Sequence, residues 1–404
     1  MSRLGGLLEG DYKVLSFKVP RRYVASASVV AIVKLVLATI LYVVQGLGSV
    51  DGFWMDATRV APIVQNEILV DAGIRAFRWA YLFLGWDGAW YASIAARGYS
   101  FSDQSFAFMP ALPVLARLLQ VALGSPIPAL VVCSLVFGVL WVPLYESVAE
   151  HYMGKRAAFL SSVVFALSPF TLLFTTMAYT EGLFLLLTLA AWKFYLDKRY
   201  LPASVASAAA ALVRIPGFLI VLPMVLGLLA SRGRGDRLRA ALIGVPTALS
   251  LLSWVVFMGL STGDPLAVIH NTEWSGMYAL PTYLTGVLPA GGLGALSFPV
   301  AYLNVHWLLP LAIWGSILLP PFLIWKLWRI DRGLCIYSLV YLASFFAFGA
   351  VVSLPRFVSV LFPLWIPFSG TFASRRWFEP VVIVGFVAAC LVLWVGFIGG
   401  VFAG

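Results

Sequence analysis

The sequence has few charged residues: 11% of its 404 residues are Asp, Glu, Lys or Arg, where a soluble domain has about 25%. It also contains only three histidines and three cysteines. Cys133, Cys335 and Cys390 lie inside apolar runs, which is typical of buried thiols and implies no disulfide framework. No group of His, Cys, Asp and Glu has the spacing of metal ligands, so we expect no obligatory metal and no other resident cofactor.

Apolar residues make up 62% of the chain. Several apolar runs reach the length of about 20 residues that a helix needs to cross a bilayer. These runs contain Gly and Pro and show no alternation of apolar and polar residues, which favours helices over membrane strands. The sequence therefore predicts an all-α polytopic membrane protein. We expect a single domain over residues 1–404, with no separate soluble domain.

Hydropathy predicts about eleven crossings. They are expected at 25–44, 126–148, 157–176, 180–197, 200–214, 216–231, 239–261, 306–328, 333–352, 356–372 and 379–402. Two long stretches between them are predicted to lie outside the bilayer, at about 46–125 and 262–305. The first is the larger, and we expect it to carry interfacial helices. At Arg214 the segment "RIPG" is expected to break a helix, because proline cannot continue one.

The formal charge of +10 follows the predicted topology. Lys and Arg gather in the loops on one side of the predicted spans, whereas Asp87, Glu181, Asp264 and Glu273 fall on the other side. The positive-inside rule places the basic loops in the cytoplasm and the acids outside. The basic balance therefore indicates orientation in a membrane rather than binding to nucleic acid. The membrane would be the cell membrane in a prokaryote and the endoplasmic reticulum in a eukaryote.

One stretch, "LGWDGAWYASIAARGYS", sets a single acid among aromatic rings. Asp87 lies between Trp86 and Trp90, and Tyr91 follows. We predict a helix over 88–97 that ends at Gly98. On this pattern Asp87 has two interpretations. It caps the helix, or it takes a proton from an attacking hydroxyl while the rings stack on a sugar.

The motif "WDGAWYASIAARGY", followed by "FAFMPALPVLARLL", resembles the N-terminal signature of the GPI mannosyltransferase II family and its prokaryotic relatives, glycosyltransferase family 76. Weaker similarities follow in the family's order: "ALSPFTLLFTTMAYTEGLF", "LVRIPG", "GDPLAVIHNTEW" and "LPRFVSVLFPLW". Met109, Thr180 and Gly182 depart from the family pattern. These departures concern the identity of the acceptor more than the class of reaction.

The resemblance implies a GT-C glycosyltransferase fold and an inverting transfer on the outer face of the membrane. The donor would be a polyprenyl- or dolichyl-phosphate sugar, most simply mannose, and the acceptor a hydroxyl of a lipid-linked oligosaccharide or glycolipid. Asp87 would be the catalytic base, with Arg356 and Arg214 on the donor phosphate. The candidate substrate-binding residues are Trp86, Trp90, Tyr91, Arg117, Tyr179, Glu181, His270 and Trp274.

Other interpretations remain open from the sequence. Arg214 and Arg356 would also fit interfacial snorkelling, and Glu181 would fit a helix first turn favoured by the dipole. A transporter or flippase for an amphiphile would place Arg214, Glu181 and Lys34 along a path. Lys34, a costly charge within the first span, is a site candidate by default, unless it reaches the inner headgroups. A third class is a non-catalytic subunit. Within the enzyme class, a different sugar or a protein acceptor is the alternative.

Overall fold

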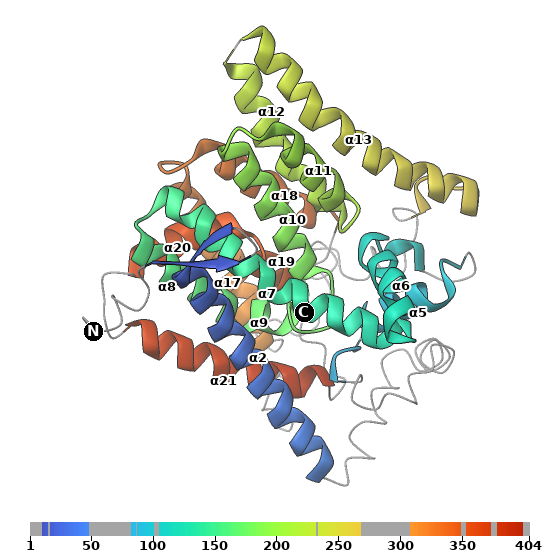
Figure 1. Ribbon diagram of the computed structural model, residues 1–404, viewed down its shortest axis with the longest axis vertical. Coiled ribbons are helices and arrows are strands. Elements are labelled where there is room, and N and C mark those ends of the chain that lie inside the picture. The colour runs from blue at the N-terminus through green and yellow to red at the C-terminus, as the bar shows by residue number, and fades with distance from the viewer. Residues whose placement is uncertain are drawn as a thin grey trace, which may run out of the picture.

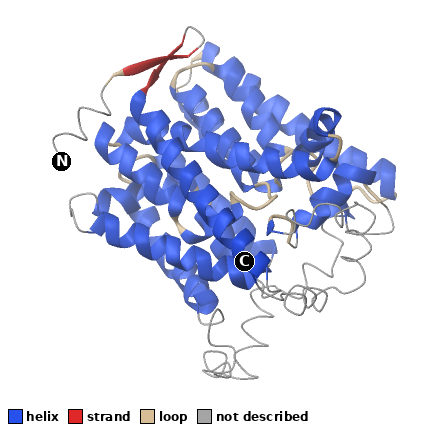
Figure 2. Ribbon diagram, turned by 60° about the horizontal axis from the view of Figure 1, so that its bottom comes forward, coloured by secondary structure: helices blue, strands red, loops and turns tan. Residues whose placement is uncertain are grey.

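The computed structural model describes residues 10–14, 17–47, 82–85, 87–100, 105–231, 233–267, 308–348, 353–372 and 378–398. Helices dominate these residues, which confirms the predicted class (Figure 2). A two-stranded antiparallel hairpin, which the sequence does not predict, precedes the first helix. Its strands are β1 (Asp11–Val14) and β2 (Phe17–Pro20), with Asp11 paired to Pro20.

The helices of the first half lie near the predicted segments, although one predicted span is divided. They are α2 (Arg21–Leu47), α5 (Asp87–Arg97), η4 (Ser105–Ala107), α6 (Ala111–Leu123), α7 (Pro126–Tyr152), α8 (Lys155–Leu167), α9 (Pro169–Phe174) and α10 (Glu181–Leu196). The second half contains α11 (Tyr200–Ala211), η5 (Ile215–Ile220), α12 (Val221–Ala230), α13 (Arg234–Thr262), α17 (Leu308–Leu327), α18 (Arg332–Phe348), α19 (Leu354–Ser359), η8 (Phe362–Leu364), α20 (Trp365–Phe372) and α21 (Phe378–Ile398).

Two segments predicted as single crossings are broken helices. The span expected at 157–176 divides into α8 and α9 at Ser168, whose extended backbone (φ −62°, ψ 144°) precedes Pro169. The span expected at 356–372 divides into α19, η8 and α20. Hydropathy reports apolar content without continuity, and proline restricts the residue before it to extended conformations. The count of eleven crossings therefore stays a prediction.

Three described helices are long and apolar enough to cross a bilayer, at Arg21–Val43, Pro126–Tyr152 and Gly235–Thr262. Large apolar side chains project outward from several helices. Leu35 of α2 is 68% exposed and Leu260 of α13 is 84% exposed. Water would penalise such surfaces, whereas lipid tails accept them. Composition and exposure together fit an integral membrane protein.

Figure 1 shows α7 and α10 near the centre of the bundle. Helices α11, α12 and α13 pack outward from α10 on one side, and α2 and α21 cover the opposite side. Helices α5 and α6 pack against α7 and against each other. Glu181 begins α10, Asp87 begins α5, and Arg214 lies between α11 and η5. The fold thus brings the starts and breaks of several helices toward one region. At such positions some backbone groups have no partner within the helix.

Lys34 fastens α2 to the interior. Its ammonium donates hydrogen bonds to Gly138 O (2.9 Å), Thr175 O (2.7 Å) and Thr175 Oγ1 (2.8 Å). The side chain is 3% exposed, and these three bonds match the three donors of an ammonium group. The sequence analysis offered two roles for Lys34, reaching the inner headgroups or lining a path. These contacts support neither role. It joins α2, α7 and the segment after α9.

The C-terminal end of α10, away from Glu181, lies in a second group of hydrogen bonds. Trp192 Nε1 donates to the hydroxyl of Tyr152 (3.0 Å), which donates to Asp331 (2.9 Å). The C-terminal ends of α7, α10 and α17 therefore meet, next to the basic residues of the predicted cytoplasmic loops. The basic group includes Lys198, Arg199, Arg329 and Arg332. Helix α10 has 16 residues, of which Glu181 is the first, so it is about 24 Å long at 1.5 Å per residue.

Candidate active site

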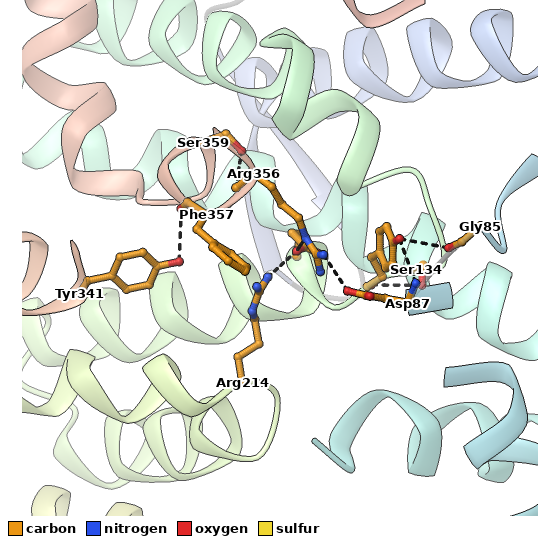
Figure 3. A network of polar contacts seen from close by, with 10 residues as sticks. Gly85, Asp87, Ser134, Arg214, Tyr341, Arg356, Phe357 and Ser359 are labelled. Carbon is orange, nitrogen blue, oxygen red and sulfur yellow. Dashed lines mark hydrogen bonds and ion pairs between the residues drawn. The ribbon is translucent and has the colours of Figure 1, made fainter. Parts of the chain in front are cut away.

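Four charged side chains from four separate segments form one connected network (Figure 3). Arg356 Nη1 donates to Asp87 Oδ2 at 2.7 Å, and Arg356 Nε donates to Glu181 Oε1 at 2.5 Å. Arg214 Nη1 also bonds Glu181 Oε1. The network therefore runs from Asp87 through Arg356 and Glu181 to Arg214. It contains two carboxylates and two guanidiniums, which balance in formal charge.

Asp87 is held in place through its backbone. The hydroxyl of Tyr179 accepts from Asp87 N (3.1 Å) and donates to Gly85 O (3.0 Å). The preceding residues are fixed as well, because Ala178 N donates to Phe83 O (2.8 Å) and α21 reaches the segment through Trp394. The Asp87 carboxylate makes no capping bond to the α5 backbone among the described contacts. It accepts from Arg356 of α19 instead, which argues against the interpretation of Asp87 as a simple helix cap.

Arg356 is buried, with 4% of its surface exposed. Its guanidinium carbon lies 4.5 Å from the centre of the Tyr179 ring and 5.0 Å from that of Phe174. Helix α19, which carries Arg356, is anchored at Ser359, whose carbonyl accepts from Thr171 (3.1 Å) and Trp365 (2.9 Å). Aromatic faces attract a guanidinium, so Arg356 is positioned by rings as well as by carboxylates. Its burial is inconsistent with snorkelling.

Arg214 lies at the helix break that the sequence predicts. Its backbone is extended (φ −154°, ψ 144°) between α11 and η5, and its side chain is 11% exposed. The guanidinium lies over Phe357, 4.7 Å from the ring centre. Because Phe357 follows Arg356 in the chain, the short helix that carries Arg356 also contacts Arg214. Arg214 and Arg356 are thus held side by side by Glu181 and by α19.

Glu181 is the residue that joins the two arginines. Its side chain is fully buried, and its Oε1 accepts from both guanidiniums. Its Oε2 has no hydrogen-bond partner among the described residues. Two cations on one oxygen make the carboxylate's charge essential to the geometry, since an unpaired buried charge is costly. Glu181 therefore does more than favour the first turn of α10.

The remaining aromatic residues of the first motif are core residues. Trp90 is 6% exposed and stacks on Phe108 with ring centres 5.6 Å apart. Tyr91 is 5% exposed and packs edge-on against the same ring at 5.3 Å. The sequence suggested that Trp90 stacks on a sugar, but its burial against Phe108 leaves no free face for one. Burial, and secondarily the Asp87 carboxylate, raise the pKa of the Tyr91 phenol, so Tyr91 stays neutral and is no rival to Asp87 as a base.

One other predicted site residue, Arg117, lies apart from the network. Arg117 is exposed on α6, and no described contact joins it to the four charged residues. Trp86, His270 and Trp274 lie outside the described residues, so their roles remain predictions. Among the described residues, no group of three His, Cys, Asp or Glu side chains is arranged to hold a metal ion.

Sequence reasoning missed the tyrosines of α18. Tyr341 donates to the carbonyl of Phe357 (3.3 Å), next to Arg356. Its ring centre lies 6.1 Å from that of Phe184, and the Arg214 guanidinium lies 5.9 Å from the same Phe184 ring, so Tyr341 borders the network. Tyr337 lies one turn earlier, with its ring centre 5.8 Å from that of Tyr341. The segment reads as an ordinary apolar span. The available signal was the spacing of four residues, which puts two phenols on one helical face.

Comparison with known proteins adds a family match over part of the chain. Residues 57–204 match the family model described as mannosyltransferase (PIG-V). The matched segment contains Asp87, Tyr179 and Glu181, whereas Arg214 and Arg356 lie beyond it. This match confirms the resemblance found from the motifs and supports a glycosyltransferase. No curated protein matches the chain.

Solved structures of an Archaeoglobus fulgidus oligosaccharyltransferase are similar at low identity. The apo form shares 13% identity over 95% of this chain and 56% of that chain, with a TM-score of 0.45. The complex with Zn and sulfate shares 13% over 86% and 53%, with a TM-score of 0.43. The archaeal oligosaccharyltransferase AglB from the same organism, in complex with an inhibitory peptide and a dolichol-phosphate, shares 14% over 88% and 57%, with a TM-score of 0.38. The chain thus spans just over half the length of these structures.

Proposed function

We propose that the protein is an inverting GT-C mannosyltransferase. It would move a mannose from a polyprenyl- or dolichyl-phosphate donor to a hydroxyl of a lipid-linked glycan or glycolipid on the outer face of the membrane. The observation that carries this proposal is the Arg356 bridge. It places a partly exposed carboxylate, Asp87, next to two arginines that other parts of the fold hold in position.

Asp87 is the proposed base. Its side chain is 21% exposed, whereas that of Glu181 is fully buried. An acceptor hydroxyl would give its proton to Asp87 as its oxygen forms a bond to the anomeric carbon. The bond from that carbon to the phosphate oxygen breaks, and its electron pair leaves with the phosphate. Attack opposite to the leaving group inverts the configuration of the sugar.

The arginines would stabilise the departing phosphate. A phosphodiester donor carries one negative charge, and the phosphate gains another as it leaves. Fixed cations next to that position lower the barrier, because they interact more strongly with the leaving group than with the ground state. Arg356 and Arg214 provide planar donors that suit phosphate oxygens. A lipid phosphate is already a good leaving group, so the proposal requires no strong general acid.

The polarity of the bundle supports a site on the outer face. The charged network lies at the N-terminal end of α10, and the basic loops lie at its C-terminal end. By the positive-inside rule the basic end faces the cytoplasm, so the network faces outward. Nucleotide sugars are not normally supplied there. A lipid-linked donor reaches such a site from within the bilayer.

The transporter alternative loses one of its path residues, because Lys34 is bonded to Gly138 and Thr175.

The enzyme proposal is tested by a transfer assay. Purified protein is mixed with synthetic polyprenyl-phosphate-mannose and a panel of glycolipid acceptors, with Asp87→Asn as the variant. We expect transfer by the wild type, and a loss of about 10²–10⁴-fold, the usual contribution of a general base, in a variant that still folds and binds donor. Equal transfer by both proteins would refute the role of Asp87, and no transfer from any lipid-linked donor would refute the proposal.

A further inference from the structure

The turn between α17 and α18 carries exposed indoles next to exposed arginines. Trp325 is 54% exposed and Trp328 is 49% exposed, although both side chains are large and mostly apolar. The Arg329 guanidinium carbon lies 4.5 Å from the centre of the Trp325 ring. That of Arg332, the first residue of α18, lies 5.5 Å from the centre of the Trp328 ring. Both distances fall within the range of about 6 Å in which an aromatic ring attracts a cation. The turn therefore presents two arginine–tryptophan pairs at the surface.

The acid that lies between these pairs in the sequence is used within the protein. Asp331 Oδ1 accepts from Leu334 N (2.9 Å), and Asp331 Oδ2 accepts from the Tyr152 hydroxyl (2.9 Å). Over the described part of the chain, no carboxylate lies within ion-pair distance of Arg329 or Arg332. An aromatic ring attracts a guanidinium but offers no oxygen to its five N–H donors. The two arginines therefore keep donors for a partner outside the chain.

A third cation near the end of α17 has a structural contact. Lys326 Nζ donates to Thr371 Oγ1 of α20 at 2.7 Å and lies 4.7 Å from the centre of the Phe322 ring. This hydrogen bond connects α17 to α20. Lys326 thus adds to the local positive potential, while the two arginines provide the exposed forks that suit phosphate oxygens.

Charge and position together indicate an anionic phospholipid as the partner. The positive-inside rule places this end of the bundle at the cytoplasmic surface, where tryptophans of membrane proteins lie at the level of the headgroups. The cytoplasmic leaflet contains anionic lipids. An indole has an apolar body that packs on acyl chains and a polar N–H for the headgroup region. A soluble phosphate or a nucleic acid would engage the guanidiniums but would have no apolar part to cover the indoles.

We propose that the two arginine–tryptophan pairs form a binding site for the headgroup of an anionic phospholipid in the cytoplasmic leaflet. The arginines would bind the phosphate oxygens, and the indoles would contact the lipid below them. The site lies away from the charged network, because Asp331 is connected through Tyr152 to Trp192, near the end of α10 opposite to Glu181. The inference therefore does not rest on the proposed transfer reaction.

The test is lipid binding to purified full-length protein in detergent, measured by native mass spectrometry. Phosphatidylglycerol and phosphatidylcholine with the same acyl chains are titrated in parallel, because both contain a phosphodiester and only the first has a net charge. One variant is Arg329→Gln/Arg332→Gln. The matched control is Lys155→Gln/Arg156→Gln, which removes two exposed charges from the start of α8, on the same predicted side of the membrane. No ring contact is found for either control residue among the described contacts.

A third variant, Trp325→Leu/Trp328→Leu, keeps both charges and removes the rings. We expect the wild type to bind phosphatidylglycerol more tightly than phosphatidylcholine. The arginine variant should raise the Kd for phosphatidylglycerol about 30-fold, since each basic residue near an anionic surface contributes about 5-fold. The tryptophan variant should raise it about 5-fold through loss of the ring contacts, and the control should leave it unchanged. Because the replaced side chains are exposed, Tm without added lipid should not change in any variant.

Three results would overturn the inference. An equal loss of affinity in the arginine variant and in the control would show that phosphatidylglycerol responds to overall charge and not to this site. Equal affinities of the wild type for the two lipids would show that the protein has no anionic-lipid site. A tryptophan variant that binds phosphatidylglycerol as tightly as the wild type would show that the rings take no part. None of these results changes the outcome expected in the transfer assay, so the proposed function is tested separately.

Discussion

Gly138 lies at a close approach between α7 and the segment after α9, and replacing it with alanine should disturb the fold and the site together. A β-carbon built on Gly138 would lie 1.9 Å from Thr175 O and 2.7 Å from Lys34 Nζ. Both are atoms of the lysine contact that joins α2, α7 and the segment after α9. Thr175 is four residues from Tyr179, which positions Asp87. The alanine must therefore push that segment away from α7.

The expected loss has two sources. Overpacking a rigid interior costs about 1–3 kcal/mol, and loosening one charge-assisted bond of Lys34 adds about 1.5–3 kcal/mol. The free energy of unfolding should fall by about 3–5 kcal/mol for Gly138→Ala. At roughly 2 °C per kcal/mol for a large chain, the Tm should fall by about 6–10 °C. Transfer activity should fall as well, because Tyr179 moves with Thr175.

The matched control is Gly385→Ala in α21, the same chemical change at a helical glycine with open space around it. Alanine is favoured over glycine in a helix by about 1 kcal/mol, so this variant should be as stable as the wild type or slightly more so. Both Tm values are measured by thermal unfolding of purified protein in the same detergent. A Gly138→Ala protein as stable as Gly385→Ala would refute the close approach and the role assigned to Lys34.

Two further predictions concern the charged network. Tyr179→Phe removes the hydroxyl that joins Gly85 to Asp87 but keeps the ring under the guanidinium. We expect kcat to fall about 10-fold for the loss of the bond that positions Asp87 with little change in Tm, and an unchanged kcat would refute that role. Glu181→Gln removes the buried charge shared by two arginines. It should lower the free energy of unfolding by about 3–5 kcal/mol and also lower transfer activity. Glu146→Gln, a buried carboxylate paired with an arginine elsewhere, should lose stability and keep transfer; similar activity in both would contradict the assignment.

Much of the helical framework could be predicted from the sequence, because hydropathy and helix signals are local. The helix of the first motif runs from Asp87 to Arg97. It ends at Gly98, whose positive φ of 86° suits glycine. The break at Arg214 is also where "RIPG" predicts it. The breaks inside 157–176 and 356–372 were missed, because a proline in an apolar run marks a kink or an end only once neighbouring helices have packed.

The candidate site was predicted in part. Counting spans placed Asp87 and Glu181 on one side of the membrane, and the structure brings these two acids into one network. The bridge between them, Arg356, lies 269 residues from Asp87 in the chain. No local pattern encodes a contact at that separation. The prediction for Trp90 failed for a related reason. A motif rich in aromatic residues does not reveal which rings the core will bury.

The sequence by itself determined the membrane environment, the helical class, the mannosyltransferase-like motif and the residue types available for chemistry, since each depends on composition or on neighbours along the chain. Only the tertiary structure decided which charges share a site. It paired two arginines on one oxygen of Glu181, turned Asp87 toward Arg356 and used Lys34 to join helices. These outcomes depend on how helices pack, because burial makes each polar group find a partner among whichever residues the fold brings near.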